Sequence, residues 1–368
     1  MRSVARLPRA LSAALCVAFS FSAALHAATP AEYRQKVGVY VWGRVASGLA
    51  GAAADVKRLG ADQVVRVFIG PGAQWDPPGQ PANEPLDVKL QRLDYREFID
   101  SFPVVMITAY DVASFARYKE APLDQETLTR TRDEFRRFTV ELSRHPGRRI
   151  LSNWEFENDC LPDNWAGCIE YYQARLDGIR QGRSEANALG YPGEILTAFE
   201  FTILPDFGGK RSGLVDAAPQ LKGVDMLSYS AWWSIGHDLT AGLMHESFKE
   251  ALRRIRATAD ERGLARRIII GEFGEYWDAH PNAERLKAVA DACIYRGVEY
   301  LFNWVLYDQP GQKDEWGRDA SHFGKYRLDG ALTPQGEAFR RWFIPAAPRG
   351  APTHDHPAAK APVRKANP

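Results

Sequence analysis

The sequence has few residues of the types on which most simple functional assignments depend. Only four of its 368 residues are cysteine and eight are histidine, and 47 basic residues are nearly balanced by 46 acidic ones. Without an excess of positive charge, composition gives no indication of a nucleic-acid partner or of an anionic membrane surface. Beyond the N-terminal segment no apolar run is long enough to span a bilayer, so we expect no membrane anchor.

The one long apolar run lies at the N-terminus and is typical of a secretory signal peptide. Three arginines precede the run LSAALCVAFSFSAAL, and LHAA offers a cleavage site after Ala27. Cys16 lies within this run, but the residue before it is Leu15, which is too large for a lipoprotein signal. We therefore expect residues 1–27 to be removed and the mature protein to be secreted or periplasmic.

Three cysteines remain after such cleavage. Cys160 and Cys168 flank the loop CLPDNWAGC and could close a small disulfide in an oxidising compartment, or stay reduced. Cys293 lies in an amphipathic helical pattern, which predicts a buried thiol. Residues 346–368 are rich in Pro and Ala without apolar periodicity, which predicts a disordered tail.

Residues 34–345 alternate between short apolar runs and segments of helical periodicity. The apolar runs predict strands at 36–42, 64–69, 103–110, 148–154, 194–201, 223–230, 266–273 and 298–305. The segments between and after them predict helices at 48–60, 95–102, 129–145, 168–189, 214–221, 246–263, 283–297 and 332–343. Near-continuous apolar strands between amphipathic helices are typical of a parallel sheet buried on both faces.

Eight such units predict a single-domain (β/α)8 TIM barrel, an α/β fold. An open, doubly wound sheet is the alternative. The first βα turn has no G-x-G-x-x-G pattern, which disfavours the dinucleotide-binding form of that alternative.

The C-terminal ends of the strands, where barrel active sites form, carry carboxylates and aromatic rings but no histidine, cysteine or lysine. The residues there are Tyr40, Trp42, Arg66, Tyr110, Asn153, Trp154, Glu155, Glu157, Glu200, Tyr229, Trp232, Trp233, Glu272, Asn303 and Trp304. Metal-dependent hydrolysis would need histidine ligands, and Schiff-base chemistry would need a lysine. Phosphate-binding barrels favour glycine-rich turns after strands 7 and 8, which are absent. We therefore expect no metal and no cofactor.

A pair of carboxylic acids beside flat aromatic faces fits glycoside hydrolysis. One carboxyl group protonates the departing oxygen, while a second, ionised one attacks or stabilises the anomeric carbon. Tryptophan and tyrosine rings can pack on the apolar faces of sugars. The predicted partner is accordingly an oligo- or polysaccharide, with no nucleic acid, and we expect a monomer.

The motif GEFG, residues 271–274, closes the seventh strand and resembles the nucleophile motif of the large (β/α)8 clan of retaining glycoside hydrolases, which includes cellulase-, mannanase- and xylosidase-like enzymes. The resemblance covers most of the mature chain. It implies that Glu272 is the nucleophile, that the acid/base glutamate follows strand 4, and that Tyr229 orients the nucleophile. It also implies that Trp304 forms an aromatic subsite floor.

Strand 4 departs from that family's usual Asn-Glu ending, because WEFEND offers three acids. Glu155 is the first to reach the predicted barrel mouth, at nearly the same count from its strand start as Glu272. Glu157 is the alternative acid/base, and Asp159 would take this role if WEFEND were aligned with the family motif. NWE followed by an acid also resembles a less characterised set of secreted barrel proteins.

The remaining strand-end residues predict substrate contacts. Asn153 would contact a sugar hydroxyl next to the reacting carbon, and Trp154, Glu200 and Trp232 would complete the sugar site. For Glu200, a supporting role that orients the acid or a hydroxyl is the leading interpretation. The sequence therefore predicts a secreted, retaining glycosidase. A non-catalytic carbohydrate-binding barrel and a transglycosylase using the same carboxylates are the alternatives.

Overall fold

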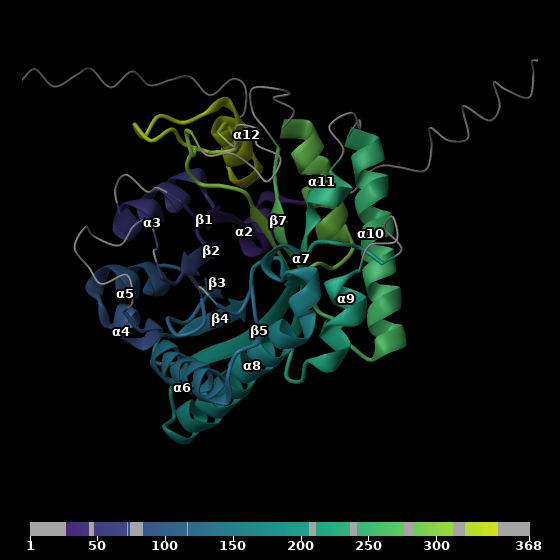
Figure 1. The fold of residues 1–368 in the computed structure, drawn as a ribbon. Coiled ribbons are helices and arrows are strands. Elements are labelled where there is room, and N and C mark those ends of the chain that lie inside the picture. The colour runs from purple at the N-terminus through teal and green to yellow at the C-terminus, as the bar shows by residue number, and fades with distance from the viewer. Residues whose placement is uncertain are drawn as a thin grey trace, which may run out of the picture.

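A computed structural model of the protein describes residues 27–43, 48–71, 73, 84–115, 117–205, 211–235, 241–275, 283–311 and 321–344. Within them, eight parallel strands form a closed barrel in which each strand pairs with the next in sequence and the last pairs with the first (Figure 1). The strands are β1 (Val37–Val41), β2 (Val64–Ile69), β3 (Val104–Ala109), β4 (Gly147–Ser152), β5 (Gly193–Phe201), β6 (Met226–Ser230), β7 (Ile268–Phe273) and β8 (Tyr300–Asn303). The predicted (β/α)8 barrel is confirmed, and the open sheet is excluded.

Helices cover the outside of this barrel (Figure 1). The α-helices are α2 (Pro30–Lys36), α3 (Gly48–Leu59), α4 (Leu86–Gln91), α5 (Leu93–Asp100), α6 (Gln125–Leu142), α7 (Phe156–Asp159), α8 (Trp165–Ala188), α9 (Gly213–Asp216), α10 (Ala241–Arg262), α11 (Ala283–Tyr295) and α12 (Pro334–Phe343). The short 3-10 helices are η1 (Pro162–Asn164), η2 (Ala218–Gln220) and η3 (Ala231–Ser234).

The strands have two buried faces, which explains their near-continuous apolar sequences. One set of side chains fills the inside of the barrel and includes Val64, Met106, Ile150, Leu196, Ala198, Met226, Ile269, Tyr300 and Phe302. The alternate residues, such as Val65 and Val67 of β2, pack outward against the helices. This alternation decides which polar residues at the strand ends face the barrel axis.

The predicted helices are present, with one change. Pro334 occupies the first turn of α12, and the Thr333 hydroxyl accepts a hydrogen bond from the Gly336 amide, as a helix N-cap does. The predicted helix at 214–221 is instead split into α9 and η2, because Pro219 lies where a continuous helix would need another amide donor.

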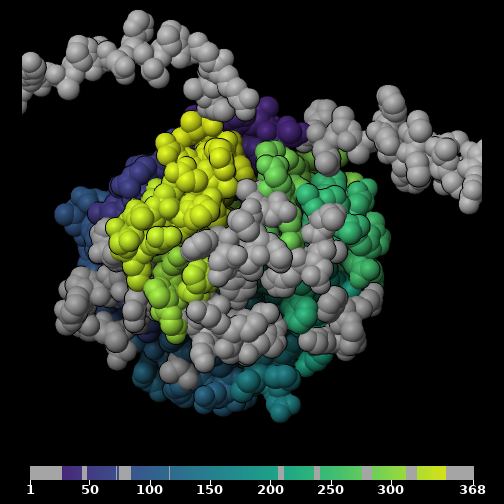
Figure 2. Space-filling view, turned by 90° about the horizontal axis from the view of Figure 1, so that it is seen from above, coloured from purple at the N-terminus to yellow at the C-terminus, as the bar shows by residue number. Residues whose placement is uncertain are grey.

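Helix α2 was not among the predicted helices. Thr29 and Glu32 form a reciprocal capping box at its start, with Pro30 in the first turn. Figure 2 shows α2, in purple, next to α12, in yellow. The rings of Tyr33 and Trp342 lie 5.6 Å apart between these helices, so the two ends of the barrel sequence pack together.

The predicted signal peptide, except for Ala27, and the predicted tail at 346–368 lie outside the described residues. Among the residues that the structure does describe, no helix is both long and apolar enough to cross a membrane.

Candidate active site

Two buried glutamates lie at the C-terminal end of the barrel. Glu155 lies three residues after the end of β4, and Glu272 is the penultimate residue of β7; each is only 3% exposed. Ser230, the last residue of β6, connects them. Ser230 pairs in register with Glu272, and its hydroxyl donates a hydrogen bond to Glu155 Oε1. The structure therefore brings together the two residues that the sequence predicts as the catalytic pair.

A β-bulge in β7 directs Glu272 toward the site. Ile269 faces the inside of the barrel, so simple alternation would point Glu272 outward. On the β6 side, however, Tyr229 pairs with Ile270 and Ser230 pairs with Glu272, so β7 holds one extra residue at this point. The same irregularity appears against β8. The extra residue returns Glu272 to the inner face, which is a common use of bulges beside active sites.

The bulge brings Gly271 close to polar side chains inside the barrel. A Cβ atom at this position would lie 1.8 Å from Glu200 Oε2 and 2.4 Å from Ser228 Oγ. Gly271 also presents its carbonyl oxygen to Arg66 Nη1 at 2.7 Å. Only glycine permits this close approach of β7 to the polar interior of the barrel.

That interior is organised around Arg66 of β2. Its guanidinium donates two hydrogen bonds to the Glu200 carboxylate, at 2.8 and 2.9 Å, and two to the Thr108 hydroxyl. Ser228 also donates to Glu200, at 2.7 Å. A buried, bidentate Arg–carboxylate pair is a rigid unit. Glu200 thus has the supporting position that the sequence analysis favoured, at the base of the site.

Glu272 has a cation and an indole as neighbours. Its Oε1 lies 3.7 Å from Arg66 Nη1 and has no hydrogen-bond partner among the described residues, whereas its Oε2 accepts from Trp232 Nε1 at 3.1 Å. Burial raises the pKa of Glu272 to about 8, opposed chiefly by Arg66 and supported by the negative charge of Glu200. The Trp232 hydrogen bond and the nearby Trp154 indole also act to lower this pKa.

Among the described residues, Glu155 has only neutral donors beside it. Ser230 and the side-chain amide of Asn158 donate hydrogen bonds to its two carboxylate oxygens. Burial, and then the charge of Glu272, raise the pKa of Glu155 well above its ordinary value. No cation is among the principal influences on this group, which distinguishes it from Glu272.

Glu157, the predicted alternative acid/base, is bound to main-chain amides. Its carboxylate accepts hydrogen bonds from the amides of Thr202, Ile203 and Gly213, at 2.9, 3.2 and 2.7 Å. The first two amides directly follow β5, and the third is that of the first residue of α9. Glu157 therefore ties α7 to the backbone that follows β5 and to the start of α9.

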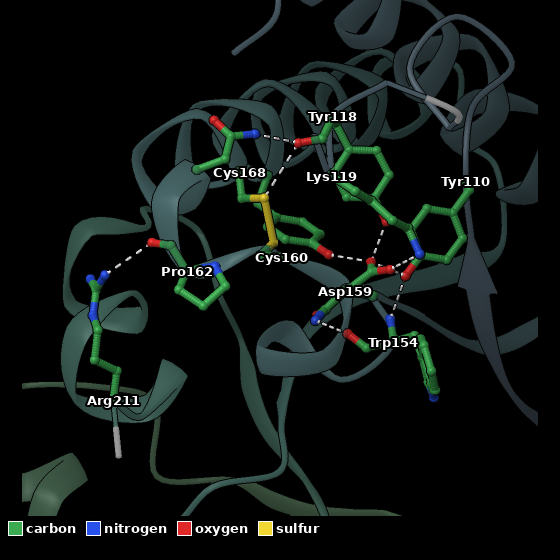
Figure 3. The surroundings of a disulfide bond; sticks show 12 residues. Tyr110, Tyr118, Lys119, Trp154, Asp159, Cys160, Pro162, Cys168 and Arg211 are labelled. Atoms are coloured by element: carbon green, nitrogen blue, oxygen red, sulfur yellow. Dashed lines mark hydrogen bonds and ion pairs between the residues drawn. A yellow bond between two sulfur atoms is a disulfide. The ribbon is translucent and has the colours of Figure 1, made fainter. Parts of the chain in front are cut away.

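Asp159, the third acid of the strand-4 run, is enclosed by tyrosines (Figure 3). Its Oδ2 accepts hydrogen bonds from the hydroxyls of Tyr110, Tyr118 and Tyr172, and Lys119 pairs with its Oδ1. The Tyr110 hydroxyl also accepts a hydrogen bond from the Trp154 amide, at 2.9 Å. The cluster thus supports the backbone immediately before Glu155.

A disulfide between Cys160 and Cys168 lies beside this cluster, with the two Cα atoms 6.2 Å apart (Figure 3). It ties the end of α7 to the first turn of α8. Closing a loop of this size contributes about 2–3 kcal/mol in the chain-entropy model. Cys293 is a buried free thiol, as predicted, and burial raises its pKa.

Asn153 and Tyr229 lie differently from the expected arrangement. The Asn153 side chain exchanges two hydrogen bonds of 2.8 Å with the main chain of Glu200, which joins β4 to β5. Tyr229 packs outward, since its neighbours Ser228 and Ser230 face the site. Its hydroxyl pairs with Ser234 at 2.8 Å, and Glu272 takes its hydrogen bond from Trp232 instead. The expectation that Tyr229 orients Glu272 is therefore corrected.

Aromatic rings surround the candidate pair. Trp304, which follows β8, packs against Tyr40, Trp42 and Trp232, with ring centroids 5.2, 5.0 and 6.5 Å away. Trp232 also packs edge-on against Phe323, at 5.6 Å. Trp42, Trp154, Trp232 and Trp304 are all partly exposed. Such rings are available to pack against the apolar face of a sugar.

Sequence reasoning did not anticipate Ser230 or Asn158. The alternation in Ser228-Tyr229-Ser230 was the available signal, because two inward serines imply an outward tyrosine. Within the described part of the chain, no group of three or more His, Cys, Asp or Glu side chains is arranged to hold a metal ion.

Comparison with solved structures shows that this (β/α)8 barrel is similar in fold to those of several glycoside hydrolases. An exo-β-1,4-mannosidase from Opitutaceae bacterium strain TAV5 matches 84% of this chain with a TM-score of 0.56 and 17% identity; the chain spans only 59% of that protein. A GH5_18 protein from Bifidobacterium longum subsp. longum matches 84%, with a TM-score of 0.55, 17% identity and 78% of its own length covered.

A broad-specificity GH5-4 endoglucanase from Clostridium longisporum matches 86% of this chain, with a TM-score of 0.55, 14% identity and 98% of its own length covered. At these identities the likeness shows the fold. No family model matches the sequence, and no curated protein is similar enough in sequence to be matched.

Proposed function

We propose that the protein is a retaining glycoside hydrolase in which Glu272 is the nucleophile and Glu155 the general acid/base. The observation that carries this proposal is the difference in charge environment between the two glutamates on either side of Ser230. Arg66 and the Trp232 indole favour the ionised form of Glu272, whereas in the described part of the chain Glu155 has only neutral donors. Two adjacent buried carboxyls cannot both ionise easily, so Glu272 loses its proton first as the pH rises and Glu155 retains its proton to higher pH.

This protonation state suits the first chemical step. Glu272 Oε1, which has no hydrogen-bond partner in the described residues, attacks the anomeric carbon, while Glu155 donates its proton to the departing oxygen. In the second step, Glu155 removes a proton from water, which then hydrolyses the glycosyl ester. The buried Arg66–Glu200 unit holds the base of the site rigid during both steps.

The substrate proposed is an oligo- or polysaccharide. Solved structures with the same fold are named as an exo-β-1,4-mannosidase and a broad-specificity endoglucanase, so β-1,4-linked mannosides and glucans are the first to test. We also propose export after cleavage at Ala27. The Cys160–Cys168 disulfide supports this, because such bonds persist in oxidising compartments.

The first prediction concerns Glu272→Ala with an aryl β-glycoside that the wild-type protein hydrolyses. We expect hydrolysis to fall by at least about a thousandfold, because the ester intermediate cannot form. Added azide should restore turnover and give the α-glycosyl azide, which mass spectrometry and NMR would identify.

The matched variant is Glu155→Ala. It should retain activity better on substrates with good phenolate leaving groups than on natural saccharides, and azide should give the β-azide. Full activity of Glu272→Ala would contradict the assignment. Saccharide binding by the wild-type protein without any turnover would favour the carbohydrate-binding alternative.

A further inference from the structure

We propose that Trp232 is the positioning residue for Glu272, in place of the tyrosine that the family resemblance implies: its indole N–H fixes one carboxylate oxygen and leaves the other to attack. This inference rests on the proposed function and adds to it a specific structural reason for the orientation of the nucleophile.

The two oxygens of Glu272 are in different surroundings. Oε2 accepts the Trp232 Nε1–H at 3.1 Å, whereas Oε1 has no hydrogen-bond partner in the described part of the chain and lies 3.7 Å from Arg66. A carboxylate held through one oxygen presents the other in a defined direction. That direction matters, because small misplacements of a reacting group are costly.

Tyr229 cannot supply the same hydrogen bond in this arrangement. The hydroxyls of Ser228 and Ser230 bond Glu200 and Glu155, so both serines face the site and the intervening Tyr229 faces the helices. There the Tyr229 ring stacks on Phe201, with centroids 5.5 Å apart, and its hydroxyl pairs with Ser234. Reaching Glu272 would require reversing the direction of the side chain at the end of β6.

The Trp232 ring is held by contacts independent of Glu272. It packs edge-on against Trp304 and Phe323, and η3 begins directly after β6. Gly274 makes room for it, since a Cβ atom there would lie 3.1 Å from the far edge of the indole and 2.9 Å from the Trp304 carbonyl oxygen. The second glycine of GEFG is thus explained by the placement of the indole.

The chemistry of the donor has a consequence for pH dependence. An indole N–H only donates and does not titrate in the range where enzymes work, whereas a phenol can also accept. Trp232 therefore favours the ionised form of Glu272 at every working pH. Removing the N–H should make Glu272 harder to ionise, and the acid limb of the activity profile should move to higher pH.

The experiment compares Trp232→Phe with Tyr229→Phe. Trp232→Phe keeps an aromatic ring and removes the donor; the acid limb of kcat/KM should rise by about one pH unit, with kcat reduced more than KM is raised. Tyr229→Phe removes the hydroxyl expected from the family resemblance, and its acid limb should stay where it is in the wild type.

An unmoved acid limb in Trp232→Phe, or an equal shift in Tyr229→Phe, would overturn the inference. If the Trp232→Phe protein does not fold, the acid limb of the kcat/KM profile in Tyr229→Phe still shows whether the Tyr229 hydroxyl acts on Glu272. Isotope-edited infrared titration of Glu272 needs no substrate. It would test the role of Trp232 even if the wild-type protein hydrolysed no glycoside, which is the separate failure of the proposed function.

Discussion

Glu155 and Glu272 are equally buried, and their neighbours alone distinguish them. Glu272 lies beside Arg66 and accepts an indole hydrogen bond, whereas Glu155 accepts from a serine and an asparagine. A guanidinium stabilises an adjacent carboxylate more than neutral donors do. Two residues of one type can thus take opposite roles in acid–base chemistry.

Glu272→Gln should stabilise the protein, increasingly so as the pH rises from 5 to 8. Burial raises the pKa of Glu272 to about 8, above the value of 4.5 for an unperturbed glutamate, so the folded state binds more protons than the unfolded state in this interval. The free energy of unfolding of the wild-type protein therefore falls as pH rises, by at most about 1.4 kcal/mol per pH unit. The glutamine variant should not show this decrease, because its side chain does not titrate.

Denaturant unfolding of both proteins at several pH values would measure the difference. Glu261→Gln is the control, because the Glu261 side chain is 72% exposed in its pairing with Arg262 and its substitution should change stability by no more than about 0.5 kcal/mol. A Glu272→Gln gain that is constant from pH 5 to 8 would show that Glu272 does not titrate in this interval.

The bulged end of β7 is the element on which the candidate site depends. The extra residue at Gly271 turns Glu272 inward, and Gly274 admits the Trp232 ring three residues later. The two glycines of GEFG are therefore required by the path of the backbone, just as Glu272 is required by the proposed chemistry. Its glycines accommodate Glu200 on one side and Trp232 with Trp304 on the other.

Gly271→Ala should destabilise the protein by about 3 kcal/mol and abolish activity, because the new Cβ atom would overlap the buried Glu200 carboxylate. Displacing Glu200 also disturbs its hydrogen bonds to Arg66 and Ser228. Thermal and denaturant unfolding, together with the hydrolysis assay, would measure both effects.

Gly242→Ala is the matched control for this prediction. Gly242 lies in α10, and an added Cβ atom there would meet nothing within 4 Å. Alanine should stabilise this helix by about 0.4–1 kcal/mol and leave hydrolysis unchanged. Similar behaviour of the two alanine variants would contradict the steric role of Gly271.

At the scale of the whole molecule, the barrel brings together strand ends that are far apart in sequence. The helices α2 and α12, which lie at the start and the end of the barrel sequence, also pack against each other. Arg66, Glu155, Glu200 and Glu272 come from four different strands or strand ends. The N-terminal helix packs against the last helix and also against α11, because the Tyr33 hydroxyl donates a hydrogen bond to Asp291.

Export should produce a protein that begins at Ala28, and Asp291 should stabilise this new terminus. The Ala28 nitrogen lies 2.9 Å from Asp291 Oδ1, so cleavage after Ala27 would place a positively charged amino group against a largely buried carboxylate. N-terminal sequencing of the exported protein would test the cleavage site. Asp291→Asn should then cost about 2 kcal/mol of unfolding free energy.

Asp260→Asn is the control, because Asp260 forms an exposed ion pair with Arg266, and its replacement should change stability by no more than about 0.5 kcal/mol. A mature terminus more than a few residues from Ala28 would contradict the predicted processing. Equal stability effects of the two substitutions would contradict the role of Asp291.

Much of the fold could be predicted from the sequence, because strands and helices leave local periodic signals. The run VVRVFI is β2 at the predicted residues, and the other strands begin and end within three residues of their predicted limits. Four short elements, α2, α4, α9 and η2, differ from prediction, because proline and capping residues rather than apolar periodicity determine their limits.

The candidate pair could also be predicted, since Glu155 and Glu272 each end an apolar strand. The side chains that surround the pair could not be predicted. Strand alternation alone would have turned Glu272 outward, and the family resemblance placed Tyr229 beside it. The direction of Glu272 depends on a one-residue bulge in β7 beside β6, which has no periodic signature in the sequence. The outward direction of Tyr229 follows from the alternation in Ser228-Tyr229-Ser230.

The sequence by itself therefore determined the eight strand–helix units and the carboxylates at their ends, because local hydrophobic periodicity and strand order specify them. Only the tertiary structure decided that Glu157 binds main-chain amides, that tyrosines enclose Asp159, and that an indole reaches Glu272. These assignments depend on contacts between distant strands, and the closed barrel and its bulge are what bring those contacts together.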